Sequence, residues 1–230
     1  MISVVACTNR LAFVPKMIEN FQRQTLKEKE LIIIINSSVL EVDLAGYRVL
    51  QFPKEVSLGA CLNKGVQLAK YEFVTKMDDD DYYGPDYLNE VYQAFVEKKA
   101  DVVGKSSFYM YFQKGNELRL YNPNHENRWI VNHGPYKSSD FLSGATLAFK
   151  KSILDKISFP DVNVGEDSGF QRLCYENRLK MFSLTKDHYA YIRYQDPQHH
   201  HSDAEDSLLR RRSRFIVHTS SLQRYVHSKK

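Results

Sequence analysis

Residues 71–88 read YEFVTKMDDDDYYGPDYL, and the four consecutive aspartates in this stretch decide how the chain is interpreted. The run just before them, residues 72–77, predicts a buried strand. Pro85 suits the first turn of a helix. The aspartate run (residues 78–81) therefore stands where a strand ends and a helix begins. Because neighbouring carboxylates repel one another, a folded chain tolerates such a run when it is solvated or when a cation lies among the acids.

The residues on either side of this stretch alternate between strand and helix patterns. The continuous apolar run at residues 31–35 is typical of a strand buried on both faces in a parallel sheet. Apolar residues at helical spacing mark the helices. The expected strands are residues 2–6, 31–35, 49–52 and 72–77, and the expected helices are residues 13–24, 58–69 and 85–98. This order predicts an α/β fold with a mostly parallel central sheet and helices on both faces.

Polar segments follow three of the expected strands, at residues 7–9, 36–38 and 78–81. Open α/β sheets bind ligands beyond the carboxyl ends of their strands. We therefore expect the three segments to meet at one rim of the sheet and to form the ligand site there.

The second half of the chain has a more mixed pattern. Residues 101–112 predict a strand that forms a hairpin with residues 117–121. Residues 122–139, which contain the single tryptophan Trp129, predict a long, substrate-facing loop. Further elements are expected as a strand at 147–149, a short helix at 151–157, a helix at 166–177 and strands at 179–185 and 189–193. No repeat or low-complexity linker divides the chain, which favours one domain.

The composition excludes several classes of protein. With 230 residues and a formal net charge of +4, the chain can bury a sizeable core, and its charge does not argue for nucleic acid as a partner. Three widely separated cysteines, Cys7, Cys61 and Cys174, lack a CxxC spacing and indicate reduced thiols in a cytoplasmic protein. The N-terminus predicts a strand instead of a signal peptide.

The spacing within the aspartate run is suited to a divalent metal ion. Residues two apart at the end of a strand point to the same side, so Asp78 and Asp80 can face one ligand together. Mg²⁺ and Mn²⁺ bind one or two carboxylates and complete their shells with water and substrate phosphates. Asp79 and Asp81 are then expected to face solvent or to cap the next helix. Taken alone, the run is better explained as an acidic turn.

A resemblance to a known family changes that preference. Residues 59–81, GACLNKGVQLAKYEFVTKMDDDD, resemble the central motif of bacterial family 2 glycosyltransferases with the GT-A fold, including its Asp-x-Asp (DXD) element. Residues 3–10, SVVACTNR, resemble the first strand of that family, and residues 21–25, FQRQT, resemble the end of its first helix. The resemblance extends over residues 2–200 and is most specific in the first hundred.

The resemblance implies a Rossmann-like nucleotide-diphospho-sugar transferase fold and a single catalytic domain at residues 1–205. Residues 1–100 would bind the nucleotide sugar and residues 101–205 the acceptor. The implied activity is that of a metal-dependent, inverting glycosyltransferase of the hexosyltransferase type. Its donor is expected to be a UDP-sugar, and its acceptor a hydroxyl of a saccharide, a lipid-linked molecule or a polymer.

The family also implies roles for individual donor-site residues. Asp80 would bind the metal ion, Mn²⁺ or Mg²⁺, and Asp78 would lie near the ribose. Thr8 and Asn36 would contact the uracil. The remaining donor-binding candidates are Asn9, Arg10, Asn63, Lys64 and Asp79.

The chain departs from the family pattern at two places. Residues 35–38, Ile-Asn-Ser-Ser, stand where Asp-Asp-Gly-Ser is usual, so Asn36 offers the base an uncharged hydrogen-bonding group. Leu62 stands where the family has an arginine that faces the diphosphate, and Lys64 is the candidate to replace that charge.

A second acidic pair, Glu166 and Asp167, begins the helix expected at residues 166–177. Acids in a first turn complement the helix dipole, which is a sufficient explanation of the pair in isolation. The resemblance implies that Asp167 is the general base for the acceptor hydroxyl and that Glu166 supports it. It also implies that Ser143 and Gly144 line the acceptor pocket, where Gly144 would let the sugar approach the backbone. Trp129 is a further acceptor-binding candidate.

Residues 198–203, QHHHSD, form an unusual histidine-rich segment. A solvated loop and an adventitious metal-binding tract are the simpler explanations. The resemblance implies a histidine that completes the metal shell, with His201 the first choice and His199 the second. A zinc site would need a cysteine or a second histidine pair at regular spacing, which the segment lacks.

Residues 206–230 are basic and predict a helical tail. A solvated helix is one explanation, and peripheral contact of residues 208–230 with anionic lipid is another. The chain is expected in the cytoplasm, with the inner face of the membrane as the alternative place.

Two other functions compete with the leading interpretation. A sugar nucleotidyltransferase also uses Mg²⁺ held by aspartate, but it would normally have a glycine-rich, cationic loop after the first strand, and residues 7–13 contain no glycine. A non-catalytic nucleotide- or carbohydrate-binding protein would have no need of the base Asp167.

Overall fold

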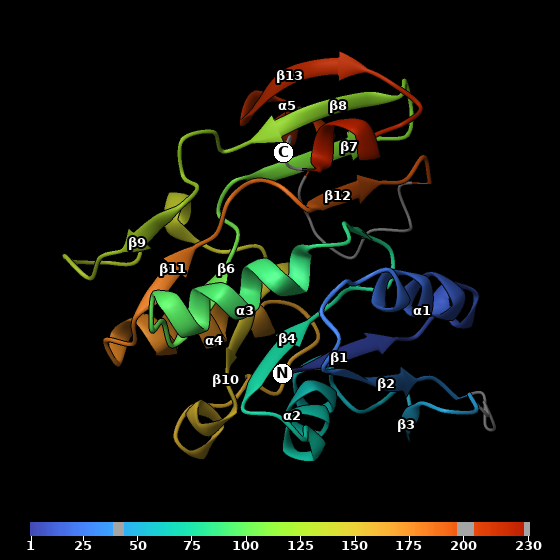
Figure 1. Ribbon diagram of the computed structural model, residues 1–230, viewed down its shortest axis with the longest axis vertical. Helices are drawn as coiled ribbons and strands as arrows, with labels where there is room; N and C mark the ends of the chain where they lie inside the picture. Colours follow the sequence, from blue (N-terminus) through green and yellow to red (C-terminus); the bar gives the residue numbers. More distant parts are fainter. Residues whose placement is uncertain (39–43, 197–204, 228–230) are drawn as a thin grey trace.

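The computed structural model of the chain describes residues 1–38, 44–196 and 205–227, and within them the strands form two sheets (Figure 1). The eight-stranded sheet has the spatial order β3 (Arg48–Phe52), β2 (Lys29–Asn36), β1 (Ile2–Thr8), β4 (Phe73–Lys76), β10 (Ala148–Lys150), β6 (Val102–Gly104), β11 (Met181–Ser183) and β9 (Arg128–Ile130). The five-stranded sheet, at the top of Figure 1, has the order β13 (Ser213–His218), β8 (Glu117–Tyr121), β7 (Phe108–Phe112), β12 (Tyr189–Arg193) and β5 (Tyr82–Tyr83).

The first half of the chain follows the expected order of strands and helices. Strands β3, β2, β1 and β4 are mutually parallel. The described helices are α1 (Val14–Gln22), α2 (Leu58–Leu68), α3 (Tyr87–Glu97), α4 (Glu166–Glu176), α5 (Asp206–Arg211) and α6 (Gln223–Val226). Beyond β4 the eight-stranded sheet is mixed, because β10 runs antiparallel to both of its neighbours.

Helices cover both faces of the eight-stranded sheet, as expected. Val4 and Ile33 share one hydrophobic core with α1 and α3, whereas Val5 and Ile34 share another with α2 and α4. Successive residues of a strand point to opposite faces, so each of the apolar strands β1 and β2 supplies both cores. A Cβ atom at Gly65 would lie 2.7 Å from the side chains of Val5 and Ile34, so glycine allows α2 to lie close to the sheet.

The helix expected from Pro85 begins instead at Tyr87. The Gly84 N–H donates to the His188 carbonyl at 2.8 Å, and the Tyr87 N–H donates to the Gly84 carbonyl at 3.1 Å. These bonds make residues 84–87 a turn that joins β5 to α3.

Two expectations for the second half are wrong. The strand expected at residues 101–112 is split into β6 and β7, which belong to different sheets. Between them the backbone N–H groups of Lys105 and Ser106 bond to the side chains of Thr146 and Ser183, at 3.0 and 3.1 Å. The loop expected at residues 122–139 contains β9, which pairs with β11. The hairpin of β7 with β8 is confirmed.

The prediction of a helical tail is also wrong for residues 213–218. These residues form β13, which pairs antiparallel with β8 at the edge of the five-stranded sheet. Arg119 secures the pairing, since its guanidinium donates to the Ser213 carbonyl and hydroxyl oxygens, both at 2.8 Å. No helix among the described residues is both long and apolar enough to cross a membrane. Contact of residues 208–230 with a membrane and the division of the chain at residues 100 and 205 stay predictions.

Candidate functional site

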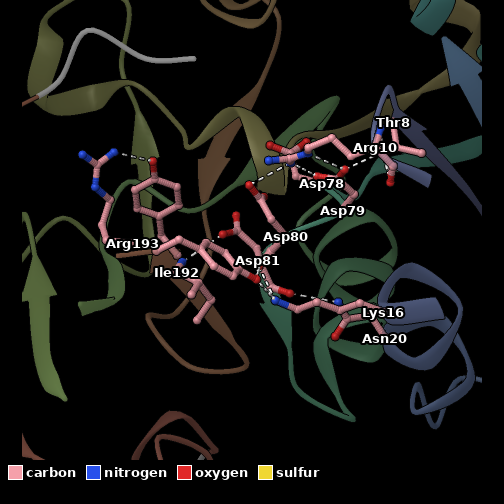
Figure 2. Close-up of polar contacts among 12 residues, drawn as sticks. Thr8, Arg10, Lys16, Asn20, Asp78, Asp79, Asp80, Asp81, Ile192 and Arg193 are labelled. Atoms are coloured by element: carbon pink, nitrogen blue, oxygen red, sulfur yellow. Dashed lines mark hydrogen bonds and ion pairs between the residues drawn. The ribbon is translucent and has the colours of Figure 1, made fainter. Parts of the chain in front are cut away.

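The aspartate run follows β4 and lies beside the end of β1 (Figure 2). Asp79 and Asp81 are 4% and 1% exposed, whereas the side chains of Asp78 and Asp80 are 36% and 13% exposed. The expectation that Asp79 and Asp81 face solvent or cap a helix is therefore wrong. Each of these two carboxylates is instead bound by groups from other parts of the chain.

Asp79 is held by the loop that follows β1. Its Oδ2 atom accepts hydrogen bonds from the Thr8 hydroxyl at 2.5 Å and from Arg10 Nε at 3.1 Å. Its Oδ1 atom pairs with Arg10 Nη2. The Thr8 oxygen in turn accepts the Arg10 backbone N–H at 2.9 Å. Thr8 is thus buried between the two residues, and its hydroxyl helps to fix the positions of Asp79 and Arg10.

Arg10 connects Asp79 to Asp80. The same Nη2 atom lies 2.9 Å from Asp80 Oδ2, and the guanidinium stacks on the ring of Phe13 at 4.6 Å. Figure 2 shows the Arg10 side chain extended across both carboxylates. The backbone of Asp80 is also held, because its carbonyl accepts hydrogen bonds from Lys16 Nζ and from the Tyr194 hydroxyl, the latter at 2.8 Å.

Asp81 links the run to the five-stranded sheet. Its carboxylate accepts the Tyr189 hydroxyl at 2.5 Å and the Ile192 N–H at 2.9 Å. Burial and the neighbouring carboxylates of Asp80 and Asp78 raise the pKa of Asp81 well above its ordinary value. These contacts give Asp81 a structural role at β12 and leave Asp78 and Asp80 as the accessible acids of the run.

Lys76, the last residue of β4, pairs with both acidic segments. Its ammonium lies 3.3 Å from Asp78 Oδ1 and 3.3 Å from Glu166 Oε1. Burial lowers the pKa of Lys76, but the carboxylates of Asp78, Glu166 and Asp167 outweigh it and raise the pKa above the ordinary value. Sequence reasoning missed this residue, although a lysine within a buried strand is the signal that could have found it.

The pKa of Asp78 is raised to about 6, first by burial and then by Asp80 and Asp79, while Lys76 opposes the shift. This rise occurs although the side chain retains the solvent access given above. The partly exposed carboxylate of Asp78 thus lies among like charges that Lys76 does not fully offset.

The expected acidic pair begins α4, after Gly165 in the left-handed conformation (φ 86°). Glu166 is buried against Lys76, whereas Asp167 is partly exposed and its Oδ1 atom accepts the Ser168 N–H at 2.6 Å. A Cβ atom at Gly144 would overlap Asp167 Oδ2. The absence of a side chain at Gly144 thus makes room for the Asp167 carboxylate, and the approach of a sugar to Gly144 stays a prediction.

Two buried tyrosines join the aspartate run to residues 143–145. The Tyr83 hydroxyl accepts the Asp78 N–H at 2.8 Å and donates to the Ala145 carbonyl at 2.6 Å. The Tyr189 hydroxyl, which bonds to Asp81, lies 3.5 Å from the Ser143 hydroxyl. The structure therefore brings together three segments that sequence reasoning had singled out separately, residues 78–81, 143–145 and 166–167.

Other candidates lie apart from this cluster. The Asn63 amide is bonded in both directions to the backbone of Phe159, at 2.9 Å each. Asn36 donates to the carbonyls of Pro53 and Val56. Lys64 and Asn9 are exposed, Lys64 on the solvent face of α2. In the described residues, the contacts of Asn36, Asn63 and Lys64 do not include the aspartate run.

Trp129 lies on β9, is 41% exposed and packs its ring at 5.1 Å from that of Phe182. It lines a separate cavity of about 360 Å³, together with Asp140 and Tyr175. The structure does not place Trp129 in the cluster formed by the aspartate run and Asp167.

The expected metal ligands are Asp80, His201 and His199. His199 and His201 lie outside the described residues. Within those residues, no group of three or more His, Cys, Asp or Glu side chains has the arrangement of a metal site. The carboxylates of Asp78 and Asp80 nevertheless fit Mg²⁺ or Mn²⁺, which take one or two carboxylates and complete their shells with water and phosphate oxygens. The raised pKa of Asp78 is consistent with a site that a cation would stabilise.

Comparison with known proteins gives a consistent result. The family model described as Glycosyl transferase family 2 matches residues 3–158. Glycosyltransferase GlyA of Streptococcus pneumoniae serotype 4 is 24% identical over 208 residues, which cover 82% of this chain and 30% of GlyA.

Two solved structures share the fold. S. aureus TarS 1–349 in complex with UDP-GlcNAc matches with a TM-score of 0.67 and 17% sequence identity. The matched region covers 90% of this chain and 63% of the TarS chain. The mannosyltransferase PcManGT of Pyrobaculum calidifontis, solved with GDP-Man and Mn²⁺, matches with a TM-score of 0.54 and 13% sequence identity. The matched region covers 84% of this chain and 56% of the PcManGT chain.

The chain spans less than two thirds of the length of each of these three proteins. The GT-A fold expected from the sequence is confirmed. Since the family model matches more than half of the residues, the chain belongs to glycosyl transferase family 2.

Proposed function

We propose that the chain is a metal-dependent, inverting glycosyltransferase that transfers a sugar from a UDP-sugar to a hydroxyl of a saccharide, lipid-linked or polymer acceptor. One observation carries the proposal. The accessible acids of the aspartate run and the carboxylate of Asp167 lie at one site, joined through Lys76 and residues 143–145. This arrangement supports the proposal, because candidate donor-binding acids and a candidate base lie at the same site.

The donor would bind over Asp78, Asp80 and Arg10. A divalent cation at Asp80 would supply positive charge to the departing diphosphate. Arg10 offers further donors to the same oxygens, and its bond to Thr8 fixes the backbone from which the side chain extends. Asp78 lies next to this group and has both the access and the hydrogen-bonding capacity to bind a ribose hydroxyl.

Asp167 is the candidate general base. Lys76 pairs with Glu166, so the Glu166 carboxylate is buried and already bound. The Ser168 N–H holds Asp167 Oδ1, and Oδ2 then lies against Gly144. An acceptor hydroxyl beside residues 143–145 would lose its proton to Asp167 as its oxygen attacks the anomeric carbon from the face opposite the diphosphate. The new glycosidic bond forms as the bond to the diphosphate breaks, which inverts the configuration.

The two alternatives receive less support. A sugar nucleotidyltransferase would normally have a glycine-rich, cationic loop after the first strand, but residues 7–13 contain no glycine and a single arginine, Arg10. The hypothesis of a non-catalytic binding protein gives no reason for the close packing of the Asp167 carboxylate against Gly144.

Calorimetric titration tests the donor site. UDP is titrated with Mn²⁺ and with chelator, into the unchanged chain and into Asp80→Ala. We expect binding that requires Mn²⁺ and that Asp80→Ala abolishes. Absence of UDP binding at every Mn²⁺ concentration would exclude a UDP-sugar as the donor.

Release of UDP from UDP-sugars tests catalysis without knowledge of the acceptor, because slow transfer to water yields the same nucleotide. We expect Asp167→Asn to retain UDP affinity and to lose about 10²- to 10⁴-fold in turnover. Equal turnover in Asp167→Asn and the unchanged chain would reject Asp167 as the base, and absence of turnover with any UDP-sugar would favour the non-catalytic alternative.

A further inference from the structure

A cavity lined by residues of β9, of the segments on either side of β9 and of α4 lies apart from the aspartate run. Its volume is about 360 Å³, and its lining includes Arg128, Trp129, Lys137 and Tyr175. We call it the β9 cavity. None of its lining residues belongs to residues 78–81, 143–145 or 166–167.

The β9 cavity carries an excess of basic side chains. Arg128, Lys137 and two histidines line it, and Asp140 is the only acid among the lining residues. Asp140 is already paired with Arg128. The exposed side chain of Lys137, which no acidic lining residue other than Asp140 can balance, favours an anionic ligand.

An aromatic surface lies beside these charges. The edge-to-face packing of Trp129 on Phe182 fixes the indole and leaves 41% of the residue exposed. A rigid, exposed aromatic ring next to a few polar groups is a common element of small-molecule sites. A sugar ring has an apolar face that can stack on such an indole, so the cavity suits a ligand that is both saccharide and anion.

The wall of the β9 cavity is connected to the candidate reaction centre. Tyr136 stacks between Phe141 and Tyr175, at 4.2 and 4.6 Å, and its hydroxyl donates to Gln171 at 3.1 Å. Gln171 in turn bonds to the backbone N–H and carbonyl of Leu142, which directly precedes Ser143. The cavity is therefore held in a fixed relation to residues 143–145.

Helix α4 gives the distance between the two sites. Asp167 lies in its first turn and Tyr175 near its end, eight residues later. At a rise of 1.5 Å per residue, the separation along the helix axis is about 12 Å. This is longer than one sugar ring, so a group in the β9 cavity would belong to a different unit of the acceptor from the one that is glycosylated.

We propose that the β9 cavity is a remote acceptor subsite that binds a negatively charged sugar unit, so that the acceptor is an anionic glycan. This inference rests on the proposed function and narrows its acceptor class. The negative charge can come from a phosphate ester or from a uronic acid carboxylate. Both satisfy the same cationic groups.

The test is a binding titration of the full chain with three fluorescently labelled oligosaccharides of equal length, one neutral, one with uronic acid units and one with phosphate esters. We expect one or both anionic ligands to bind at least about tenfold more tightly than the neutral one, with an affinity that falls as salt is added. The stronger anionic ligand identifies the source of the charge. Equal affinity for the neutral and the anionic ligands would overturn the proposal.

Matched variants locate the binding. Lys137→Glu and Trp129→Ala are each expected to weaken the preferred anionic ligand about tenfold. Lys114→Glu makes the same charge reversal on the exposed β7–β8 turn, and Tyr225→Ala removes an exposed aromatic ring from α6. Both lie away from the cavity and should leave affinity unchanged. Thermal denaturation of Trp129→Ala checks that the contact with Phe182 is not required for folding. Unchanged affinity in both cavity variants would overturn the assignment.

Titration of UDP with Mn²⁺ into the same variants separates this inference from the proposed function. UDP binding without a preference for anionic saccharides would reject the remote subsite and leave the donor site intact. Anionic saccharide binding that depends on Lys137 and Trp129, in a chain that binds no UDP, would confirm the cavity as a saccharide site and reject the proposed donor.

Discussion

Gly144 lies directly against the carboxylate of Asp167, so closely that a Cβ atom at position 144 would overlap Oδ2. We expect Gly144→Ala to displace the carboxylate and to lower turnover by roughly 10²-fold, the loss that a misplacement of about 1 Å can cause. UDP affinity should be unchanged, since the substitution does not touch the aspartate run. Steady-state release of UDP and calorimetric titration measure the two quantities.

Gly115→Ala is the control for a general loss of stability. Gly115 lies on a hairpin turn with φ +94°, and a Cβ atom there would have no contact within 4 Å. Full activity in Gly144→Ala would show that the position of Asp167 is not critical.

Neighbouring aspartates should respond differently to the same substitution. Asp81→Ala leaves the Tyr189 hydroxyl and the Ile192 N–H without their partner, and each buried unsatisfied group costs about 1–3 kcal/mol. We expect a large fall in the free energy of unfolding of Asp81→Ala. Asp80→Ala, in contrast, should lose Mn²⁺-dependent UDP binding with little change in stability. Denaturant unfolding and calorimetry of both variants check the prediction, and equal destabilisation by the two substitutions would contradict it.

The pKa of Asp78 gives the stability of the chain a specific pH dependence. The folded-state pKa of about 6 lies above the unfolded value of about 3.9, so the folded state binds this proton more tightly. Ionised Asp78 therefore opposes folding above about pH 6, and its contribution to stability improves as the pH falls from about 7 to about 4. In buffer with chelator, we expect Asp78→Asn to gain less stability than the unchanged chain over this interval. Parallel pH profiles of the two unfolding free energies would contradict the prediction.

Asn63 is expected to contribute to the free energy of unfolding and not to the affinity for the donor. Its side chain makes two hydrogen bonds to the backbone of Phe159. Asn63→Ala leaves those buried or half-buried groups unpaired, and we expect a loss of about 1–3 kcal/mol in the free energy of unfolding. UDP affinity should not change. Lys64→Ala, at the exposed adjacent position, should alter neither quantity, and a fall in UDP affinity in either variant would restore the donor role expected from the sequence.

The sequence predicts best those features that depend on local patterns. The strands and helices before residue 100 have clear periodicity, and parallel strand ends converge at one edge, which is why the aspartate run and the loop after β1 could be placed together. Apart from the β7–β8 hairpin, the five-stranded sheet depends on distant pairings, such as Ser213 with Tyr121, which no local pattern encodes. The burial of Asp79 and Asp81 likewise depends on Arg10 and Tyr189, which lie far away in the sequence. For the same reason the sequence did not show that Lys76 pairs with Glu166.

Arg10 gives the site a built-in counter-ion, because its guanidinium pairs with the carboxylates of both Asp79 and Asp80. Binding of a metal ion at Asp80 would then replace one positive charge, the Arg10 guanidinium, with another. Arg10 would give up its bond to Asp80 when a cation binds there, and a diphosphate arriving with that cation would receive the released guanidinium. Each ligand creates part of the binding site of the other, so the two affinities must rise by the same factor. The chain would therefore bind nucleotide and cation cooperatively, and it would bind either one weakly when the other is absent.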